Sequence, residues 1–428
     1  MIAAYFLWNT RGGWTARFTQ DDIMNLYGAW TEPWGRLVDG AVLFFTPIVR
    51  PVGGLFYKAI DSFAGLNPTP YRFAAMLLLA VNVWLLYAVA RRVADRRESG
   101  LLAALFGAFH VRMADLYFST GSAYDVLAYL FVMAAMLVHL RGGPMWAVCG
   151  VFALALGSKE VAVGLPVVLF AYELLWNRRK TVRDWLWERG AAPFATGAMA
   201  VLFVLGRAGK SHLANNPAYT PTFTAERFFE TWGTYLDRLV LREQWMGAWA
   251  VAAVLGALLA VGLAKRSKAM VFGWLWLVAF TLPLNFIPPR GLFAMYLPLA
   301  GLCLWLGVLL APVWRALPAI AVALTLAWEP QRAAMLWWTE EPSRRIHAMT
   351  EDLREVRLPA KASVLLIDDP FETDEWTPLF LVRMSQRDAE IGVFRTKMNP
   401  ELKDRMADFS FLYRFESGRM RLVRGASQ

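Results

Sequence analysis

Two adjacent carboxylates, Asp21 and Asp22, lie just outside the first apolar stretch of an otherwise oily chain. Like charges side by side repel each other, and near a bilayer they are costly to desolvate. A pair in this place is therefore expected to take part in chemistry or ligand binding. The alternative is structural, because Asp is a good N-cap and a helix is predicted over residues 23–30.

Further acids and cations stand at the ends of other apolar runs. Arg50 lies between Pro47 and Pro51, which restrain the backbone. Lys159 and Glu160 separate two apolar runs with almost no loop, which places them at the membrane edge. Other candidates near predicted outer turns are Asp125, Arg290 and Tyr296. Acids and cations from separate turns would form one site at the membrane–water boundary. Two simpler interpretations stay open: Lys159 pairs with Glu160, or Arg50 contacts lipid headgroups without specificity.

The elements that must position these residues are apolar. Of 428 residues, 57% are hydrophobic and 18% are charged, against about 25% charged in soluble domains. Apolar runs recur near the length of about 17–25 residues that a helix needs to cross a bilayer. The sequence therefore predicts an all-α polytopic membrane protein with about eleven transmembrane helices. The predicted spans are residues 1–10, 72–90, 100–117, 123–140, 144–158, 161–176, 190–208, 246–264, 269–287, 291–311 and 316–329. The first is too short to cross a bilayer at about 1.5 Å per residue, which predicts a truncated helix or a start upstream of Met1.

The net charge of +10 gathers in clusters that follow alternate spans. The positive-inside rule assigns such clusters to the cytoplasm. They are Arg91-Arg92 with Arg96-Arg97, Arg141, Arg178-Arg179-Lys180 with Arg183, and Lys265-Arg266 with Lys268. This orientation predicts a multi-pass protein of the plasma membrane, with its N-terminus inside and its C-terminus outside. Because the charges interrupt membrane spans, no nucleic-acid partner is expected. Cys149 and Cys303 lie in apolar spans, where packing is expected rather than a disulfide.

Two parts of the chain are predicted. Residues 1–329 form the transmembrane domain, with outer loops at 11–71 and 209–245. Aromatic residues over 223–245, including Trp245, predict an amphipathic helix that lies on the membrane. Residues 330–428 are more polar, and a strand-like run at 363–367 ends in Asp368-Asp369-Pro370. This tail is predicted to be a small extracytoplasmic α/β domain.

Several segments resemble the GT-C membrane glycosyltransferases, which include the protein O-mannosyltransferases, the tetratricopeptide-linked O-mannosyltransferases and the lipid A aminoarabinose transferases. Asp21-Asp22 is similar to their acidic pair in the first outer loop. Arg50-Pro51 is similar to a Lys-Pro or Arg-Pro step that follows that pair. Ser158-Lys159-Glu160 is similar to a Ser-Lys-Glu segment of the tetratricopeptide-linked branch. Arg290 with Met295-Tyr296-Leu297-Pro298 is similar to an Arg-Tyr-Leu-Tyr-Leu-Pro segment of that branch, with residues inserted after the Arg. The resemblance covers about residues 15–310, and no tetratricopeptide repeats follow.

The resemblance implies a transferase that moves a sugar from a polyprenyl-phosphate donor to a protein, lipid or glycan acceptor on the outer face, with a mannosyltransferase as one possibility. Asp21 would be the general base and Asp22 would orient the acceptor or a metal. Arg50 would hold the donor phosphate, with Lys159 and Arg290 as secondary candidates. Glu160, Asp125 and Tyr296 are further site candidates.

No cofactor is firmly implied, although two adjacent carboxylates permit a divalent metal. Besides the polyprenyl-phosphate sugar and the acceptor, the expected partners are membrane lipids. Two alternatives remain. One is a non-catalytic membrane scaffold of the same fold, and the other is a transporter of a lipid-linked substrate. A transporter is expected to place charges in mid-membrane and to contain inverted repeats.

Overall fold

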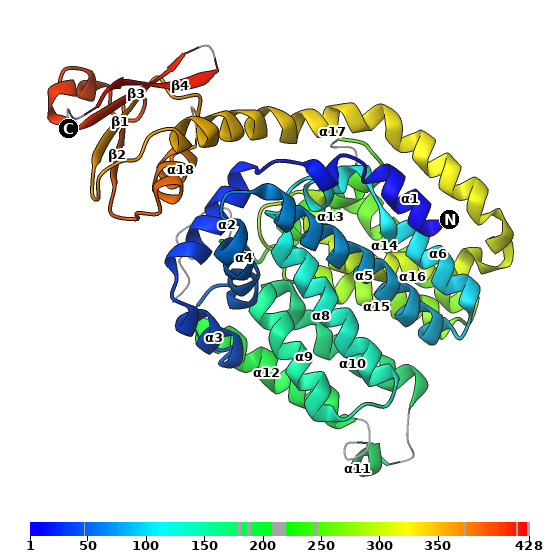
Figure 1. Cartoon of the computed structure of the whole chain (residues 1–428). Coiled ribbons are helices and arrows are strands. Elements are labelled where there is room, and N and C mark those ends of the chain that lie inside the picture. Colours follow the sequence, from blue (N-terminus) through cyan, green and yellow to red (C-terminus); the bar gives the residue numbers. More distant parts are fainter. Residues whose placement is uncertain are drawn as a thin grey trace.

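Helices form most of the chain up to Arg354, and a small sheet follows (Figure 1). The structure is a computed structural model that describes residues 1–428 except 47, 178–180, 186–189, 208–219, 244–245, 372–373, 417 and 426–428. The predicted cluster Arg178-Arg179-Lys180, Pro47, Trp245 and part of the 209–245 loop therefore lie outside the described residues. The helices are α1 (Ile2–Asn9), α2 (Gln20–Thr31), α3 (Trp34–Val42), α4 (Pro51–Ala64), α5 (Pro68–Ala94), α6 (Arg97–Ala108), α7 (Ala114–Phe118), α8 (Ala123–Leu140), α9 (Met145–Ser158), α10 (Leu165–Trp176), α11 (Val182–Trp185), α12 (Ala191–Arg207), α13 (Ala225–Leu239), α14 (Ala248–Ala264), α15 (Lys268–Thr281), α16 (Tyr296–Leu310), α17 (Leu317–Arg354) and α18 (Thr377–Gln386).

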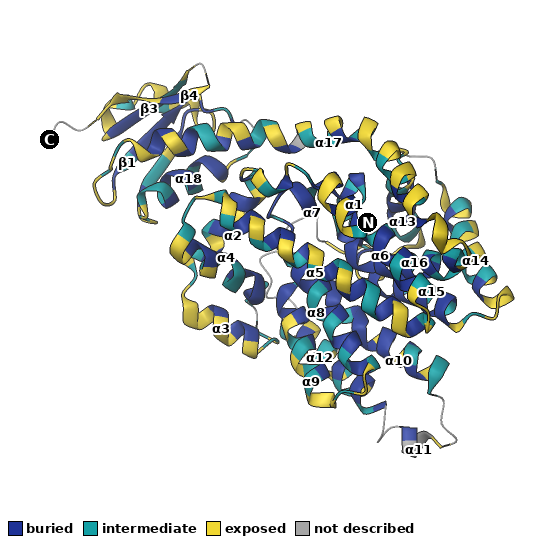
Figure 2. Cartoon of the chain, turned by 45° about the vertical axis from the view of Figure 1, so that its right-hand side comes forward, coloured by how far each residue is buried: buried dark blue, intermediate teal, exposed yellow. Residues whose placement is uncertain are grey.

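The core lies where α5, α6, α8, α15 and α16 pack against one another, and Figure 2 shows its buried residues in dark blue. Two glycines bring α15 and α16 close together. A Cβ at Gly273 would meet the carbonyl oxygen of Gly301, and a Cβ at Gly301 would meet that of Gly273. Small residues at a helix–helix contact allow such an approach and increase dispersion contact, which is the main source of helix association in lipid.

Several helices are long and apolar enough to cross a membrane. By length and composition these are α5, α8 and the helical run Leu292–Arg354, and α6 with Val111–Phe118 is a fourth if that pair, bent by 61°, forms one span. Shorter apolar helices are α9, α12, α14 and α15. A polytopic membrane protein is therefore supported, but eleven spans are not established. Part of the reason is that predicted spans are interrupted: 100–117 breaks near His110, and the helix in 269–287 ends at Thr281.

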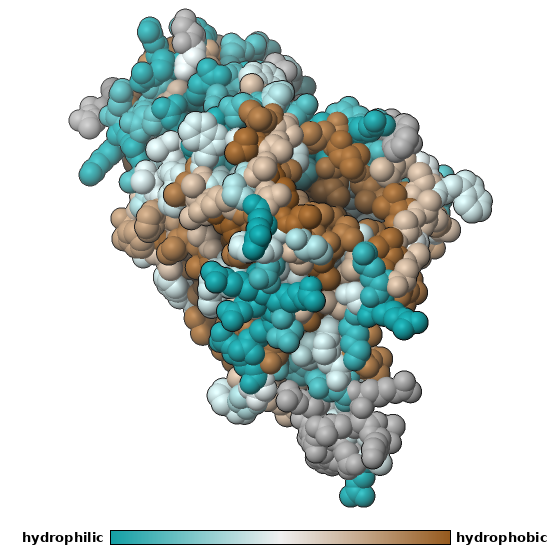
Figure 3. Space-filling view, turned by 90° about the vertical axis from the view of Figure 1, so that its right-hand side faces the viewer, coloured by the Kyte–Doolittle hydropathy of each residue, from teal (hydrophilic) through white to brown (hydrophobic). Residues whose placement is uncertain are grey.

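Surface hydropathy agrees with a membrane location. Figure 3 shows a broad band of hydrophobic side chains across the middle of one face, below a hydrophilic C-terminal part. The predicted amphipathic helix is present as α13, but its position differs from the prediction. Trp232 is 0% exposed and Tyr235 is 1% exposed, because the aromatic face packs into the helical core rather than onto lipid.

The C-terminal part contains a four-stranded sheet in the order β2-β1-β3-β4. Its strands are β1 (Ser363–Ile367), β2 (Gly392–Arg395), β3 (Phe411–Glu416) and β4 (Arg419–Arg424). The predicted strand at 363–367 is confirmed as β1, which pairs in parallel with β2 and β3, while β3 and β4 are antiparallel. The predicted boundary at 329/330 falls inside α17, which continues to Arg354 and links the bundle to the sheet (Figure 1).

The C-terminal part packs on the first loop through α18 and α2. The rings of Tyr27 and Phe380 stack with centroids 3.9 Å apart. Arg387 donates to both carboxylate oxygens of Asp61 at 2.8 and 3.0 Å. Helix α2, whose first turn contains Asp21 and Asp22, is therefore held in place by contacts with the C-terminal part.

Candidate active site

A cavity of about 350 Å³ collects most of the charged residues predicted for the site. It contains residues from α2, the start of α4, α8, the α9–α10 junction, the end of α12 and the segment before α16. Its charged lining comprises the carboxylates Asp21, Asp125 and Glu160 and the cations Arg50, Lys159, Arg207 and Arg290. Six predicted residues thus meet in one place, and the excess of one cation suits an anionic group.

Asp21 is in the first turn of α2 and is exposed to the cavity. The backbone of Gly121 approaches so closely that a Cβ there would meet the Asp21 Cβ. Burial raises the pKa of Asp21, the charge of Arg290 lowers it, and the charge of Asp374 raises it, with a net increase. A carboxylate with a raised pKa is a stronger base than an ordinary aspartate.

Asp22 serves the start of α2 instead. Its side chain is 0% exposed and accepts from the Thr19 backbone N–H at 2.7 Å in a capping box. The Ser119 hydroxyl donates to it at 3.1 Å. Burial raises the pKa of Asp22 to about 6, although the hydrogen bonds from Thr19 oppose the rise. Asp22 therefore supports the start of α2 and does not line the cavity, whereas its neighbour Asp21 does.

Only one carboxylate of the acidic pair faces the cavity, and the described residues contain no group of three or more His, Cys, Asp or Glu side chains arranged to hold a metal ion.

Arg50, Glu160 and Arg207 form a charged triad on one wall. Arg50 Nε and Nη2 donate to Glu160 Oε2 at 3.2 and 3.0 Å, and Arg207 Nη1 lies 3.4 Å from Oε1. Burial alone would raise the pKa of Glu160, but Arg50 and then Arg207 hold it down to about 2. Arg50 adopts a left-handed backbone with φ 51° directly before Pro51, the first residue of α4. This backbone directs the guanidinium into the cavity from a restrained position.

Arg207 was not predicted as a site residue. The signal for it is an arginine at the end of the apolar run 191–206 that would face outward in the predicted topology, where cationic residues are less common than on the cytoplasmic side. Its Nη2 also donates to the Ile48 carbonyl at 2.8 Å, which ties α12 to the segment before Arg50.

Lys159 pairs with Asp125, not with its neighbour Glu160 as one interpretation of the sequence suggested. The Lys159 Nζ donates to both Asp125 oxygens at 2.6 Å. The Asp125 side chain is 7% exposed and that of Lys159 is 15% exposed. The adjacent residues 159 and 160 thus point to different partners, because the chain leaves helix α9 at this place and a 3₁₀ turn begins at Glu160.

Arg290 lies on the wall beside Asp21, and its backbone is held on both sides. Its N–H donates to the Tyr235 hydroxyl at 3.2 Å, and its carbonyl accepts from the Arg238 guanidinium. Helix α13 therefore positions the segment that carries Arg290.

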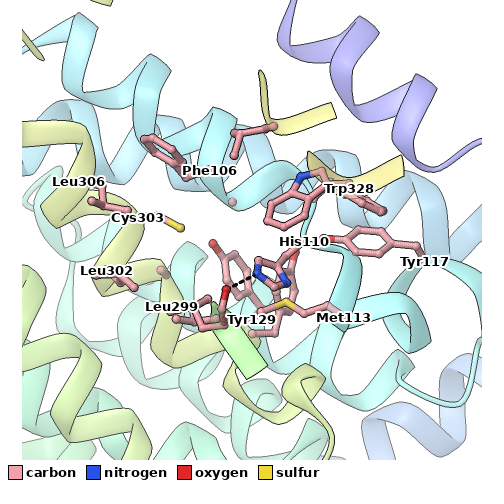
Figure 4. A pocket seen from close by; sticks show the side chains of 16 residues that line it. Phe106, His110, Met113, Tyr117, Tyr129, Leu299, Leu302, Cys303, Leu306 and Trp328 are labelled. Carbon is pink, nitrogen blue, oxygen red and sulfur yellow. Dashed lines mark hydrogen bonds between the residues drawn. The ribbon is translucent and has the colours of Figure 1, made fainter. Parts of the chain in front are cut away.

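Tyr296 is not in the charged cavity. It stacks on Tyr129 with ring centroids 4.2 Å apart and lines a separate apolar cavity of about 170 Å³ (Figure 4). Tyr129 lies one helical turn beyond Asp125 on α8, so the two cavities adjoin this helix at neighbouring turns. His110 lines it too, with Nε2 3.0 Å from the Leu239 carbonyl.

A buried arginine joins the segments that support the acidic pair. Arg72 is 0% exposed and donates to the Gly13 carbonyl at 2.8 Å, to the Tyr117 carbonyl and to the Thr120 hydroxyl. These bonds join α5 to the first loop and to the 117–120 segment, whose Ser119 supports Asp22.

Comparison with known proteins gives one match. Residues 47–205 match the family model of the dolichyl-phosphate-mannose-protein mannosyltransferases. No curated protein matches the chain. The matched stretch includes Arg50, Asp125, Lys159 and Glu160, whereas Asp21 precedes it and Arg290 follows it.

Proposed function

We propose that the chain is a membrane glycosyltransferase of the GT-C type that moves a sugar from a polyprenyl phosphate to a hydroxyl acceptor on the extracytoplasmic face, and the family match of residues 47–205 supports this class of enzyme. The observation that carries the proposal is the cavity that joins Asp21 to four cations. A hydroxyl acceptor needs a base, and a phosphate leaving group needs cations.

In the proposed reaction the acceptor oxygen attacks the anomeric carbon of the donor. The bond from that carbon to the phosphate oxygen breaks, and its electron pair leaves with the lipid phosphate. Asp21 takes the proton of the acceptor hydroxyl. Arg290, beside Asp21, and Arg50 neutralise the phosphate charge, and Arg is suited to this because it can bind phosphate bidentately.

For the lipid chain of the donor we propose the apolar cavity. This cavity adjoins the next turn of α8 and is lined mainly by aromatic and aliphatic side chains (Figure 4). A polyprenyl chain can occupy such a lining while its phosphate stays at the polar end. We assign Tyr296 to this chain-binding part and not to the phosphate.

The first test replaces the base. Asp21→Asn should lower turnover by a factor of about 100 or more, since general-base catalysis contributes about 10²–10⁴. The exposed Asp39 on α3 offers a matched control, and Asp39→Asn should keep wild-type transfer. The measurement is transfer of radiolabelled sugar from a polyprenyl phosphate by purified protein. Wild-type turnover in Asp21→Asn would remove the proposed base.

The second test replaces the phosphate ligands. Arg50→Ala and Arg290→Ala should each raise the donor concentration for half-maximal rate, and Arg50→Lys should retain part of the affinity, because the charge stays while the bidentate geometry is lost. Unchanged saturation in Arg50→Ala, Arg290→Ala and Lys159→Ala together would exclude a lipid-phosphate donor at this cavity.

A further inference from the structure

A second charged recess lies between α17 and the C-terminal sheet, with a volume of about 720 Å³. Three separate parts of the chain form it: the segment before α2, the outer part of α17, and the carboxyl ends of β1, β2 and β3. Its charged residues are Arg17, Arg344, Arg345, His347 and Lys397, together with Glu341, Asp368 and Asp369. We call this recess the sheet-edge groove.

The groove lies where the strand order of the sheet reverses. From β1 the chain passes to β2 on one side and then returns to β3 on the other side, and both pair in parallel with β1. Open α/β sheets bind ligands in the crevice at the carboxyl ends of strands at such a switch point. Asp368 directly follows β1, and Lys397 closely follows β2.

The charges of the groove favour an anion. Asp369 is already bound by Arg395, whose Nη2 and Nε donate to it at 2.6 and 2.9 Å. Glu341 pairs with Arg344 at 3.0 Å, but this pair is at the surface, with side chains 36% and 60% exposed. Exposed pairs contribute little and exchange partners readily. Arg17 is exposed and makes no hydrogen bond or ion pair with the described residues.

We propose that the sheet-edge groove binds a sugar that carries a phosphate or carboxylate group. Arg17 and Arg344 provide guanidinium groups that match planar anionic oxygens. The exposed carboxylate of Asp368 can accept from sugar hydroxyls, and Phe415 offers an apolar ring for a sugar face. Apolar residues of α17 continue to position 338, about two turns before Arg344, so the test below also includes an anionic lipid.

The position of the groove links it to the charged cavity. Arg17 is four residues before Asp21, a stretch that spans at most about 14 Å. We therefore propose that a glycan anchored at Arg17 extends toward Asp21 as an acceptor. This link, unlike the binding itself, rests on the proposed function.

The test measures binding in the full-length protein, in nanodiscs of neutral phosphatidylcholine. Calorimetric titrations use glucose 6-phosphate and glucuronate as anionic sugars, with glucose and inorganic phosphate for comparison. The double variant Arg17→Gln/Arg344→Gln should weaken binding of the anionic sugars by about tenfold or more, since it removes charge-assisted hydrogen bonds. Arg17→Lys/Arg344→Lys should lose less. Arg405→Gln removes the same type of charge from an exposed site of the C-terminal part and should bind as wild type.

Four results would overturn the proposal. These are no binding of either anionic sugar, undiminished binding in the double Gln variant, inorganic phosphate bound as tightly as glucose 6-phosphate, or loss of sugar binding when phosphatidylglycerol is added to the nanodiscs. Loss of binding in Arg50→Ala with retention in the double variant would place the sugar in the charged cavity instead. Asp21→Asn should bind like wild type, so failure of the groove and failure of the transferase mechanism give different results.

Discussion

Glu160 is predicted to increase the stability of the protein and to lower the affinity of the charged cavity for an anion. Glu160→Gln removes a carboxylate that accepts hydrogen bonds from both Arg50 and Arg207. The repulsion between these two cations then loses this compensation, which destabilises the fold. The same change removes a negative charge that competes with a phosphate for the two guanidinium groups, so stability and anion affinity should move in opposite directions.

The stability term follows from the pKa of Glu160. Its fall from 4.5 to about 2 corresponds to about 3 kcal/mol at about 1.36 kcal/mol per unit. The side chain is 39% exposed, so solvent screening reduces the expected loss in Glu160→Gln to about 1–2 kcal/mol. Because the folded-state pKa is lowered, the ionised form stabilises the fold fully above about pH 4.5, and this contribution is lost as pH falls toward about 2.

The affinity term follows from the charge of the cavity. Removal of one negative charge some 7 Å from a bound phosphate, at an effective dielectric constant of about 40, is worth about 1 kcal/mol. This corresponds to about fivefold tighter binding of a monoanion.

Two assays check the pair of effects. Chemical unfolding from pH 7 to pH 3 should show a stability gap between wild type and Glu160→Gln that narrows as pH falls, and titration with farnesyl phosphate at pH 7 should show the tighter binding. Glu390→Gln removes a carboxylate from an exposed surface pair with Lys361 and should change neither quantity. A Glu160→Gln protein as stable as wild type at every pH, or one that binds farnesyl phosphate more weakly, would refute the reasoning.

Three further predictions concern the ion pairs and the topology. Asp125→Asn should destabilise the protein by about 3 kcal/mol or more, because it leaves the largely buried cation of Lys159 without its partner. The double variant Asp125→Asn/Lys159→Met removes that cation and should restore part of the lost melting temperature, and a double variant that melts as low as Asp125→Asn would contradict the prediction. Arg387→Ala should loosen the C-terminal part by removing the bidentate bond to Asp61, so protease should cleave the 355–362 segment faster, and unchanged cleavage would contradict this. A reporter enzyme fused to the C-terminus should be active only outside the cytoplasm, whereas cytoplasmic activity would reverse the proposed face of the site.

Local sequence signals determined the class of protein and much of its secondary structure. Composition and the length of apolar runs indicated a polytopic membrane protein, because the bilayer sets the length and polarity of each span. The strand at 363–367 and helix α8 were predicted with the bounds that the structure has. The motif order around Asp21, Arg50 and Lys159 indicated a GT-C glycosyltransferase, and the family match supports this.

Only the tertiary structure decided how the charges are shared. Sequence neighbours do not share surroundings: Asp21 opens to the cavity while Asp22 is buried in a capping box, and Lys159 and Glu160 pair with residues from different helices. Arg207 lines the charged cavity, although the sequence around it contains none of the segments that resemble the GT-C glycosyltransferases. Ion pairs and burial depend on side chains that are far apart in the sequence, so a local sequence pattern cannot predict them. The capping and pairing of each carboxylate, and with them its pKa, are properties of packing.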